Sequence, residues 1–218
     1  MDRWFVVGGA MTHMGLLASF LGGCVLFGSF AQGQTLRRVA AIDLPGPKGQ
    51  RFDYLTIDAE DQFLLSAHLG PGILYVIDMQ NNKLVKAIAG VPGITGLEFV
   101  PGTGKVYTSD WGEEKIGIVD LHSMNVLKRL PTEAKPNGSA YAARFHKMYV
   151  ANTLGKAVSV VDADKDEIVK VLRFESETGM PQYDSSSRRV WINLRNSNEI
   201  AEIDPATDQV LGRYPVDS

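Results

Sequence analysis

The chain has 218 residues, 44% of them hydrophobic, and its 22 Lys and Arg against 25 Asp and Glu give a formal net charge of −3. This composition is that of a soluble globular body with enough length to bury a core, and it lacks the concentrated basic residues that a nucleic-acid-binding surface needs. Its single cysteine, Cys24, excludes an intramolecular disulfide, a thiolate metal site and a C-x-x-C-H haem attachment motif.

Residues 1–31 have the pattern of an export segment. No Asp, Glu, Lys or Arg occurs from Trp4 to Leu36, and Ser29 and Ala31 place small residues just before a cleavage position at Gln32. An apolar run followed by a small-residue exit is typical of a secretory signal peptide. We therefore expect the body of the protein, residues 32–218, to lie in the periplasm or outside the cell.

Two other interpretations of this segment stay open. The uncharged run exceeds the roughly 20 residues of a membrane-spanning helix, so it also fits an uncleaved anchor, although Arg37 and Arg38 disfavour translocation of its far side. Residues 21–24 resemble a bacterial lipoprotein box, but the apolar run continues beyond Cys24. In each case the membrane is contacted only through this segment.

The body of the chain repeats with a period of 42 residues. Two series of residues show the period: Asp78, Asp120, Asp162 and Asp204, and, seven positions after each, Val85, Leu127, Val169 and Leu211. An apolar or β-branched run ends before each aspartate, at 74–77, 116–119, 158–161 and 200–203, and another lies upstream, at 63–66, 106–109, 148–151 and 190–193. A still earlier run carries Ile57, Phe99, Tyr141 and Tyr183 in register. Each unit is thus predicted to hold four short strands.

Units of about 40 to 45 residues with four antiparallel strands are typical of β-propeller blades. The sequence therefore predicts an all-β propeller with four blades, at about 50–91, 92–133, 134–175 and 176–217. Each repeated aspartate begins the turn between the third and fourth strands, where a carboxylate accepts backbone N–H bonds. We interpret these aspartates as turn residues and not as metal ligands.

The segment 149–162 (YVANTLGKAVSVVD) resembles the repeat of the YVTN β-propeller family, and the likeness extends more loosely over residues 36–217. This resemblance implies a propeller similar to those of quinoprotein amine dehydrogenases, haem-d1 nitrite reductases and archaeal surface-layer proteins. Many such proteins are exported and have seven blades, often closed by an N-terminal strand that completes the last blade. Residues 36–44 look like this clasp strand, yet the fourth repeat already has its own fourth strand. We therefore expect part of a larger propeller, with a closed four-bladed ring as the other possibility.

Ligands of propellers usually bind at one mouth of the central channel, between the loops that lead into the first strands and the loops that follow the second strands. The first set of loops also offers Thr95 and Gln182, and His68, Asp110 and Asn152 are equivalent by the 42-residue period. The predicted ligand-binding residues are Arg51, Asp53, His68, Asp110, Trp111, Asn137, Asn152 and Arg195. The alternative is that these residues cap turns, contact water or, for Trp111, pack against a neighbouring blade.

No catalytic or metal-binding residues are predicted. The sequence lacks G-x-S-x-G, H-E-x-x-H and P-loop motifs, and its histidines fall in positions that do not converge. We expect an exported binding or scaffold module for a protein, a peptide or a small ligand, without a cofactor. The resemblance leaves open an oxidoreductase-related propeller: a subunit like those of quinoprotein dehydrogenases, or a degenerate haem-d1-type domain with His68 as ligand. A hydrolase that uses a channel carboxylate and Ca²⁺ is a third, weaker hypothesis.

Overall fold

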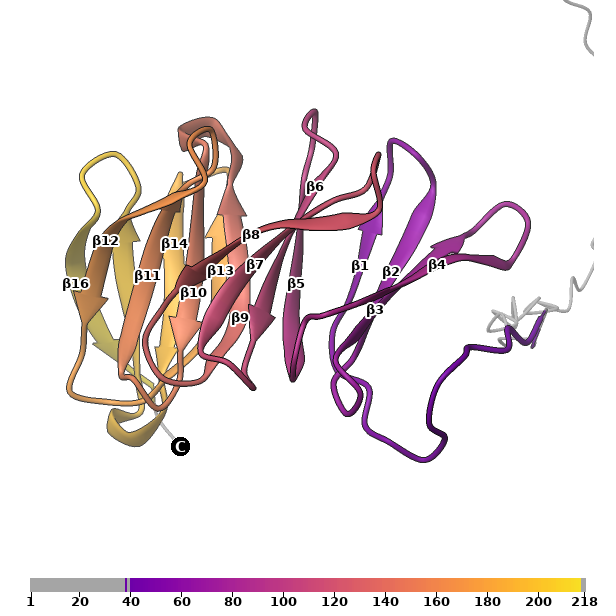
Figure 1. Cartoon of the computed structure of the whole chain (residues 1–218). Coiled ribbons are helices and arrows are strands. Elements are labelled where there is room, and N and C mark those ends of the chain that lie inside the picture. Colours follow the sequence, from indigo (N-terminus) through magenta and orange to yellow (C-terminus); the bar gives the residue numbers. More distant parts are fainter. Residues whose placement is uncertain (1–37, 39, 217–218) are drawn as a thin grey trace, which may run out of the picture. The chain divides into compact units, whose positions relative to one another are not determined.

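The computed structural model describes Arg38 and residues 40–216 (Figure 1). The predicted export segment, including Cys24 and the cleavage position at Gln32, lies outside the described residues. The described residues 40–216 belong to one compact unit, to which everything below refers. Within the described part of the chain, no helix is long and apolar enough to cross a membrane.

The described residues form sixteen strands in four antiparallel four-stranded sheets, each a simple up-and-down meander. The first sheet holds β1 (Leu55–Asp58), β2 (Phe63–His68), β3 (Ile73–Asp78) and β4 (Lys83–Ala89). The second holds β5 (Ile94–Val100), β6 (Lys105–Asp110), β7 (Lys115–Asp120) and β8 (Asn125–Pro131). The third holds β9 (Pro136–Ala142), β10 (Lys147–Asn152), β11 (Ala157–Asp162) and β12 (Glu167–Arg173), with the short helix η1 (Ala143–Phe145). The fourth holds β13 (Thr178–Asp184), β14 (Arg189–Leu194), β15 (Glu199–Asp204) and β16 (Gln209–Pro215), with η2 (Arg195–Ser197).

The 42-residue period persists in the details of the backbone. The register between the third and fourth strands shifts at Val76, Ile118, Val160 and Glu202, which are equivalent positions of the four repeats. The turn before each fourth strand places Asn82, Met124, Asp166 and Asp208 in the left-handed region, with φ between 52 and 56°. The predicted four repeats of four antiparallel strands are thus confirmed.

The repeated aspartates shape the turns between the third and fourth strands, as the sequence predicts. The carboxylate of Asp78 accepts the backbone N–H groups of Gln80 and Asn81 at 2.8 and 3.0 Å. At the equivalent position of the second sheet, hydrogen bonds from Ser123 and His122 lower the pKa of Asp120 to about 2. These carboxylates are therefore ionised turn residues.

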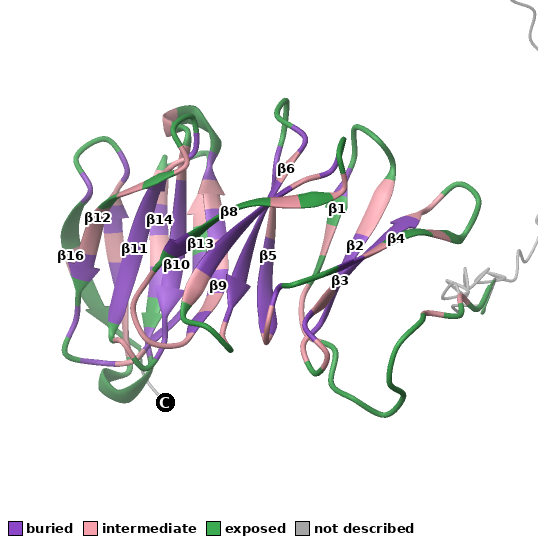
Figure 2. Cartoon of the chain, viewed as in Figure 1, coloured by how far each residue is buried: buried purple, intermediate pink, exposed green. Residues whose placement is uncertain are grey.

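Three apolar layers hold the sheets together, and the buried residues mark them in Figure 2. The layer between the first and second sheets contains Leu65, Val76, Leu97 and Phe99. Corresponding layers join the second sheet to the third and the third to the fourth. Strands β1, β5, β9 and β13 are the innermost, because each contacts the next along the series. Burial of these layers is the main driving force for stacking the sheets.

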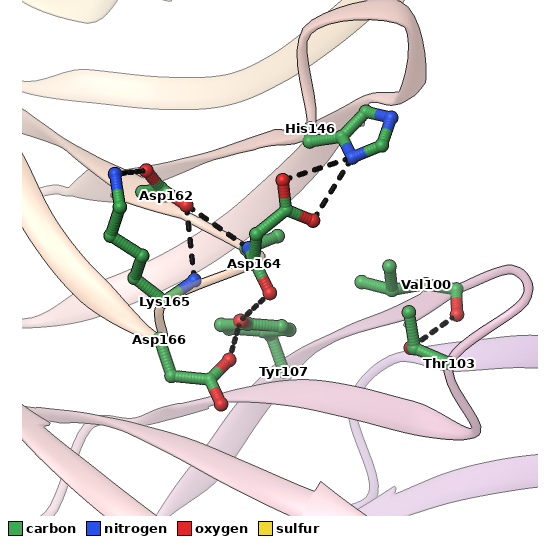
Figure 3. A network of polar contacts seen from close by, with 9 residues as sticks. Val100, Thr103, Tyr107, His146, Asp162, Asp164, Lys165 and Asp166 are labelled. Atoms are coloured by element: carbon green, nitrogen blue, oxygen red, sulfur yellow. Dashed lines mark hydrogen bonds and ion pairs between the residues drawn. The ribbon is translucent and has the colours of Figure 1, made fainter.

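A polar contact repeats beside two of these layers. The Lys105 ammonium lies 2.7 Å from the carboxylate of Asp166. The buried Tyr107 hydroxyl also donates a hydrogen bond to that carboxylate, as Figure 3 shows. One repeat later, Lys147 lies 2.7 Å from Asp208, and Tyr149 donates to that carboxylate at 2.6 Å. Burial and the neighbouring carboxylate raise the pKa of each tyrosine well above its usual range. We call this contact the inter-sheet clamp.

The two terminal faces of the stack differ in chemistry. Leu55 and Ile57 on β1 are 62% and 54% exposed, although their equivalents Leu97 and Phe99 are buried. On the outer face of the fourth sheet, by contrast, Glu202 replaces the buried Val160 of the third. The carboxylate of Glu202 accepts a hydrogen bond from the Tyr214 hydroxyl at 2.7 Å and pairs with Arg189 at 3.2 Å. The first face therefore exposes aliphatic side chains, whereas the outer face of the fourth sheet carries an ion pair beside the rings of Trp191 and Tyr214, whose centroids lie 5.9 Å apart.

Two features of the sequence pattern can be located in the structure. Val85, Leu127, Val169 and Leu211, which mark the period, are 46 to 56% exposed on the fourth strands. On β4, β8 and β12 it is the residue three positions later, Ile88, Leu130 or Leu172, that is buried in a layer between sheets. Residues 40–44 of the segment 36–44 form no strand. The clasp interpretation thus stays a prediction.

Candidate functional site

A cavity of about 370 Å³ opens at the end of the sheets where the second strands finish and the first strands begin. All four sheets contribute to its wall. The lining residues are Arg51, Asp53, Leu69, Thr95, Trp111, Asn137 and Arg195. We call it the mouth cavity, and its volume lies within the range of ligand pockets.

Two series of equivalent positions build this wall. Asp53, Thr95 and Asn137 are 42 residues apart and lie just before or at the start of the first strands. Leu69, Trp111 and Arg195 belong to a second series and come directly after the second strands. The remaining position of this second series, Thr153, is buried and does not line the cavity. Stacking the repeats therefore gathers residues that are far apart in the sequence.

The mouth cavity carries an excess of positive charge. Arg51 is paired with Asp53, whose carboxylate lies 2.8 Å from the guanidinium. Arg195 is exposed and forms no ion pair with any residue between positions 40 and 216. The lining residues therefore present one uncompensated guanidinium in a protein whose net charge is −3. Such a local reversal of sign attracts anions to the cavity.

The indole of Trp111 is held from behind. The Lys135 ammonium lies 5.3 Å from the centroid of the indole ring and 3.4 Å from the Trp111 carbonyl oxygen. Lys135 itself is not among the residues that line the cavity. A cation over an indole face is an attractive contact, so this arrangement orients the ring.

The loop that carries Trp111 is fixed to the connection between the first two sheets. Its backbone N–H donates to the Gly93 carbonyl at 3.2 Å, and the Gly112 N–H donates to Pro92 at 2.9 Å. Gly93 has a φ of 66°, and a Cβ there would lie 2.6 Å from the Gly112 nitrogen. Only glycine fits this close approach of two chains without strain. The aromatic wall of the cavity is therefore preorganised.

The polar groups on the wall differ in their availability. The Thr95 hydroxyl is used for packing, since it lies 3.0 Å from the Ser109 carbonyl and 3.1 Å from the Pro136 carbonyl. The half-buried side chain of Asn137 makes no hydrogen bond with other described residues. Asn137 and Arg195 are therefore the two polar side chains that a ligand can engage without breaking an existing contact.

Three of the predicted site residues lie outside the mouth cavity. His68, Asp110 and Asn152 are the last residues of β2, β6 and β10, and all three are buried. The Asn152 amide illustrates their environment, because it donates to Ser159 at 2.9 Å and accepts from Thr132 at 3.0 Å. Asp110 and Asn152 face the space between sheets, whereas His68 lies on the other face of the first sheet, against residues 42–52. Arg51, Asp53, Trp111, Asn137 and Arg195 are the predicted residues that the structure brings together.

Asp110 is a buried carboxyl group beside the site. Its Oδ1 accepts the Thr108 hydroxyl at 2.8 Å, while Oδ2 has no hydrogen-bond partner among the described residues. Gly117 faces it, because a Cβ at that position would lie 2.8 Å from Oδ2. Burial raises the pKa of this carboxyl to about 7, although the Thr108 hydrogen bond acts in the opposite direction.

His68 lines a second cavity of about 240 Å³, formed mainly with residues 42–52. Its ring stacks on Phe52 with a centroid separation of 4.0 Å. The Tyr75 hydroxyl donates to the Pro45 carbonyl and lies 3.1 Å from Nδ1 of His68. Nε2 of His68 is buried and has no hydrogen-bond partner among the described residues. Within residues 40–216, no three His, Cys, Asp or Glu side chains converge as a metal site.

Sequence reasoning missed Leu69 as a lining residue. The 42-residue spacing of Leu69, Trp111 and Arg195 is a signal that could have found it. We expected the neighbouring series of His68, Asp110 and Asn152 to face the mouth. This series lies one position before that of Leu69, Trp111 and Arg195. Successive residues of an extended chain point to opposite sides, so a shift by one position replaces cavity-lining side chains by buried ones.

The comparisons with known proteins agree with this architecture. No protein-family model matches the chain. Over 114 residues, the chain is 26% identical to the protein NirF of Stutzerimonas stutzeri, which covers 52% of this chain and 28% of that protein. Among solved structures, Kuenenia stuttgartiensis hydrazine synthase superposes with a TM-score of 0.69 and 14% identity, over 79% of this chain and 53% of that one.

The dihydro-haem d1 dehydrogenase NirN, in complex with DHE, superposes with a TM-score of 0.66 and 16% identity. The match covers 78% of this chain and 38% of NirN. The chain thus spans about half or less of the length of the proteins that it matches. These propellers share its fold, and the described residues are a β-propeller arrangement of four-stranded blades.

Proposed function

We propose that this protein is an exported ligand-binding module of the YVTN-repeat type that uses the mouth cavity without catalysing a reaction. The observation that carries the proposal is the wall of that cavity, because four sheets each contribute side chains at equivalent repeat positions. Two of these groups, Asn137 and Arg195, have no partner among the described residues. A rigid scaffold with free polar groups at one cavity is the usual design of a binding site.

The same wall does not favour catalysis. Asp53 is the only carboxylate among the lining residues, and it is paired with Arg51 at 2.8 Å. A general acid or base has to be free to exchange a proton with the substrate within hydrogen-bond distance. Asp110 has a raised pKa, but its side chain is buried between sheets. Binding is therefore the activity that this geometry supports best.

A cavity-filling variant tests the proposal. We expect a panel of small metabolites to contain compounds that raise the melting temperature of the native protein, because ligands that bind only the folded state stabilise it. Asn137→Trp fills the cavity and should abolish these shifts. Lys128→Trp, on the exposed outer strand β8, is the matched control and should retain them. Compounds that stabilise both variants equally, or a panel without any effect, would contradict the proposal.

The comparisons favour one second candidate, the handling of a tetrapyrrole such as the one named in the NirN structure. Of the two arginines at the mouth, Arg51 is paired with Asp53, so Arg195 is the one that suits a tetrapyrrole carboxylate. His68, however, lines the separate second cavity, so the described residues do not combine an imidazole with these arginines. A tetrapyrrole held at the mouth would bind through its carboxylates, without His68 as an iron ligand.

Haem added to the purified protein tests this candidate by its absorption spectrum. We expect a stoichiometric shift of the main absorption band that Arg195→Ala abolishes and His68→Ala leaves unchanged. A shift that needs His68 would place the tetrapyrrole elsewhere, and no shift at all would remove this candidate while leaving the binding module untouched.

A further inference from the structure

We propose that the mouth cavity selects a small aromatic monocarboxylate, with the carboxylate at Arg195 and the ring against Trp111. This inference rests on the proposed function, because it names the class of ligand for the same site. It combines the charge of the wall, the aromatic surface and the free amide.

The charges of the lining residues favour a single negative charge on the ligand. Arg51 and Asp53 neutralise each other at 2.8 Å, so Arg195 supplies the one positive charge that is left over. A planar guanidinium binds a carboxylate through two parallel hydrogen bonds. A dianion such as phosphate would need a second free cation or a set of backbone N–H donors, and the Asp53 carboxylate would repel it. A neutral or cationic ligand would leave Arg195 unpaired.

The apolar part of the wall favours a flat ring. Leu69 and Trp111 stand at equivalent positions of the first two repeats and form the apolar portion of the lining. Lys135 holds the indole from outside the cavity, and the contacts of Gly93 and Gly112 fix its loop. An aromatic ring gains an offset-stacked or edge-to-face contact with a fixed indole in addition to the burial of its surface.

The remaining groups limit the size and polarity of the ligand. A cavity of about 370 Å³ is at the small end of ligand pockets. The Tyr54 side chain extends from the first sheet to the third, since a Cβ on Gly138 of β9 would lie 3.1 Å from its hydroxyl oxygen. The free amide of Asn137 can bind one polar substituent on the ring. A ligand of one or two rings fits these dimensions.

Calorimetric titration with benzoate tests the proposal, with cyclohexanecarboxylate, benzyl alcohol and phosphate as comparison compounds. We expect benzoate to bind about threefold to tenfold more tightly than cyclohexanecarboxylate, which has the same charge but lacks the aromatic ring. Benzyl alcohol and phosphate should bind at least about tenfold more weakly than benzoate. Added salt should weaken benzoate binding because the contact is charged.

Two variants and a control locate the binding. Arg195→Gln and Trp111→Leu should each weaken benzoate binding about tenfold or more. Arg144→Gln, at an exposed position of η1, should leave it unchanged, and circular dichroism checks that each variant is folded. Equal binding of benzoate and cyclohexanecarboxylate, or unchanged binding by Arg195→Gln, would overturn the assignment. If no carboxylate binds while neutral compounds from the metabolite panel do, the ligand class is wrong and the proposed function stands. If nothing binds at the cavity, both fail.

Discussion

Replacing Asp110 by Asn should remove a pH dependence from the stability of the second sheet. The carboxyl group is fully buried, Oδ2 has no described partner, and its pKa is raised from 3.8 to about 7 by burial. Between these two values the unfolded chain loses the proton while the folded protein keeps it. The folded protein then binds more protons, so its free energy of unfolding falls as the pH rises from about 4 to about 7 and is constant above.

The size of the effect follows from the shift of the pKa. Roughly three pKa units at about 1.36 kcal/mol each correspond to about 4 kcal/mol. Arg129 and Lys115 both favour the ionised form, and relaxation toward them reduces the effect, so we expect about 2 to 4 kcal/mol. The Asn side chain has nearly the same shape and keeps an oxygen for the Thr108 hydroxyl. Its amide nitrogen adds a cost of about 1 to 3 kcal/mol that does not depend on pH.

Urea unfolding at about pH 4.5 and about pH 8 measures this difference. The free energy of unfolding of Asp110→Asn, relative to the native protein, should increase by about 2 to 4 kcal/mol between the two pH values. Groups that titrate elsewhere in the protein contribute equally to both proteins and cancel in this difference. Glu98→Gln should show the same pH dependence, because burial also raises the pKa of the Glu98 carboxyl to about 7. Parallel pH profiles for Asp110→Asn and the native protein would mean that water reaches the carboxylate, and the burial argument would fail.

Two further predictions concern packing. Tyr149→Phe deletes the hydrogen bond of the inter-sheet clamp to Asp208 and should lower the free energy of unfolding by about 1 to 3 kcal/mol. Tyr141→Phe is the control, because this hydroxyl makes no described side-chain hydrogen bond, and it should change the free energy little. Equal losses for the two variants in urea unfolding would refute the role of the clamp. Gly93→Ala should cost more than the roughly 1 kcal/mol expected for alanine at a positive φ, because its Cβ meets the Gly112 backbone. Gly102→Ala is the control for the positive φ alone, because φ there is 77° and a Cβ would have no atom within 4 Å. Equal losses of stability for the two variants would show that the backbone shifts to avoid the contact between the new Cβ at position 93 and Gly112.

The fold could be predicted from the sequence because each repeat has the same pattern of apolar runs and turn residues. Local signals that recur every 42 residues predict that the third strands end at the four aspartates, that turns follow there, and that there are four sheets. The inter-sheet clamp was not foreseen, since Lys105 and Asp166 are 61 positions apart and belong to different repeats. A contact between repeats depends on how the sheets stack, and no local pattern records it.

The candidate site was only partly accessible for a related reason. The period identifies which positions are equivalent but not the side of the chain to which each side chain points. At the end of β6, Asp110 turns into the space between sheets, while Trp111, one position later, reaches the cavity. Polar character alone favoured Asp110, and the apolar Leu69 was left out. The direction of a side chain at a strand end is decided by the stacking of sheets.

The unlike chemistry of the two terminal faces bears on self-association. If copies stacked head to tail, the exposed Leu55 and Ile57 of one molecule would meet the surface around Glu202 of the next. That contact would bring the ion pair of Glu202 and Arg189 into an apolar layer, and the loss of hydration would cost several kcal/mol. Head-to-tail contacts that are favourable and do not close into a ring add copy after copy and form open filaments. Among the described repeats, the ion pair on the fourth sheet therefore disfavours head-to-tail stacking of copies onto the exposed Leu55 and Ile57.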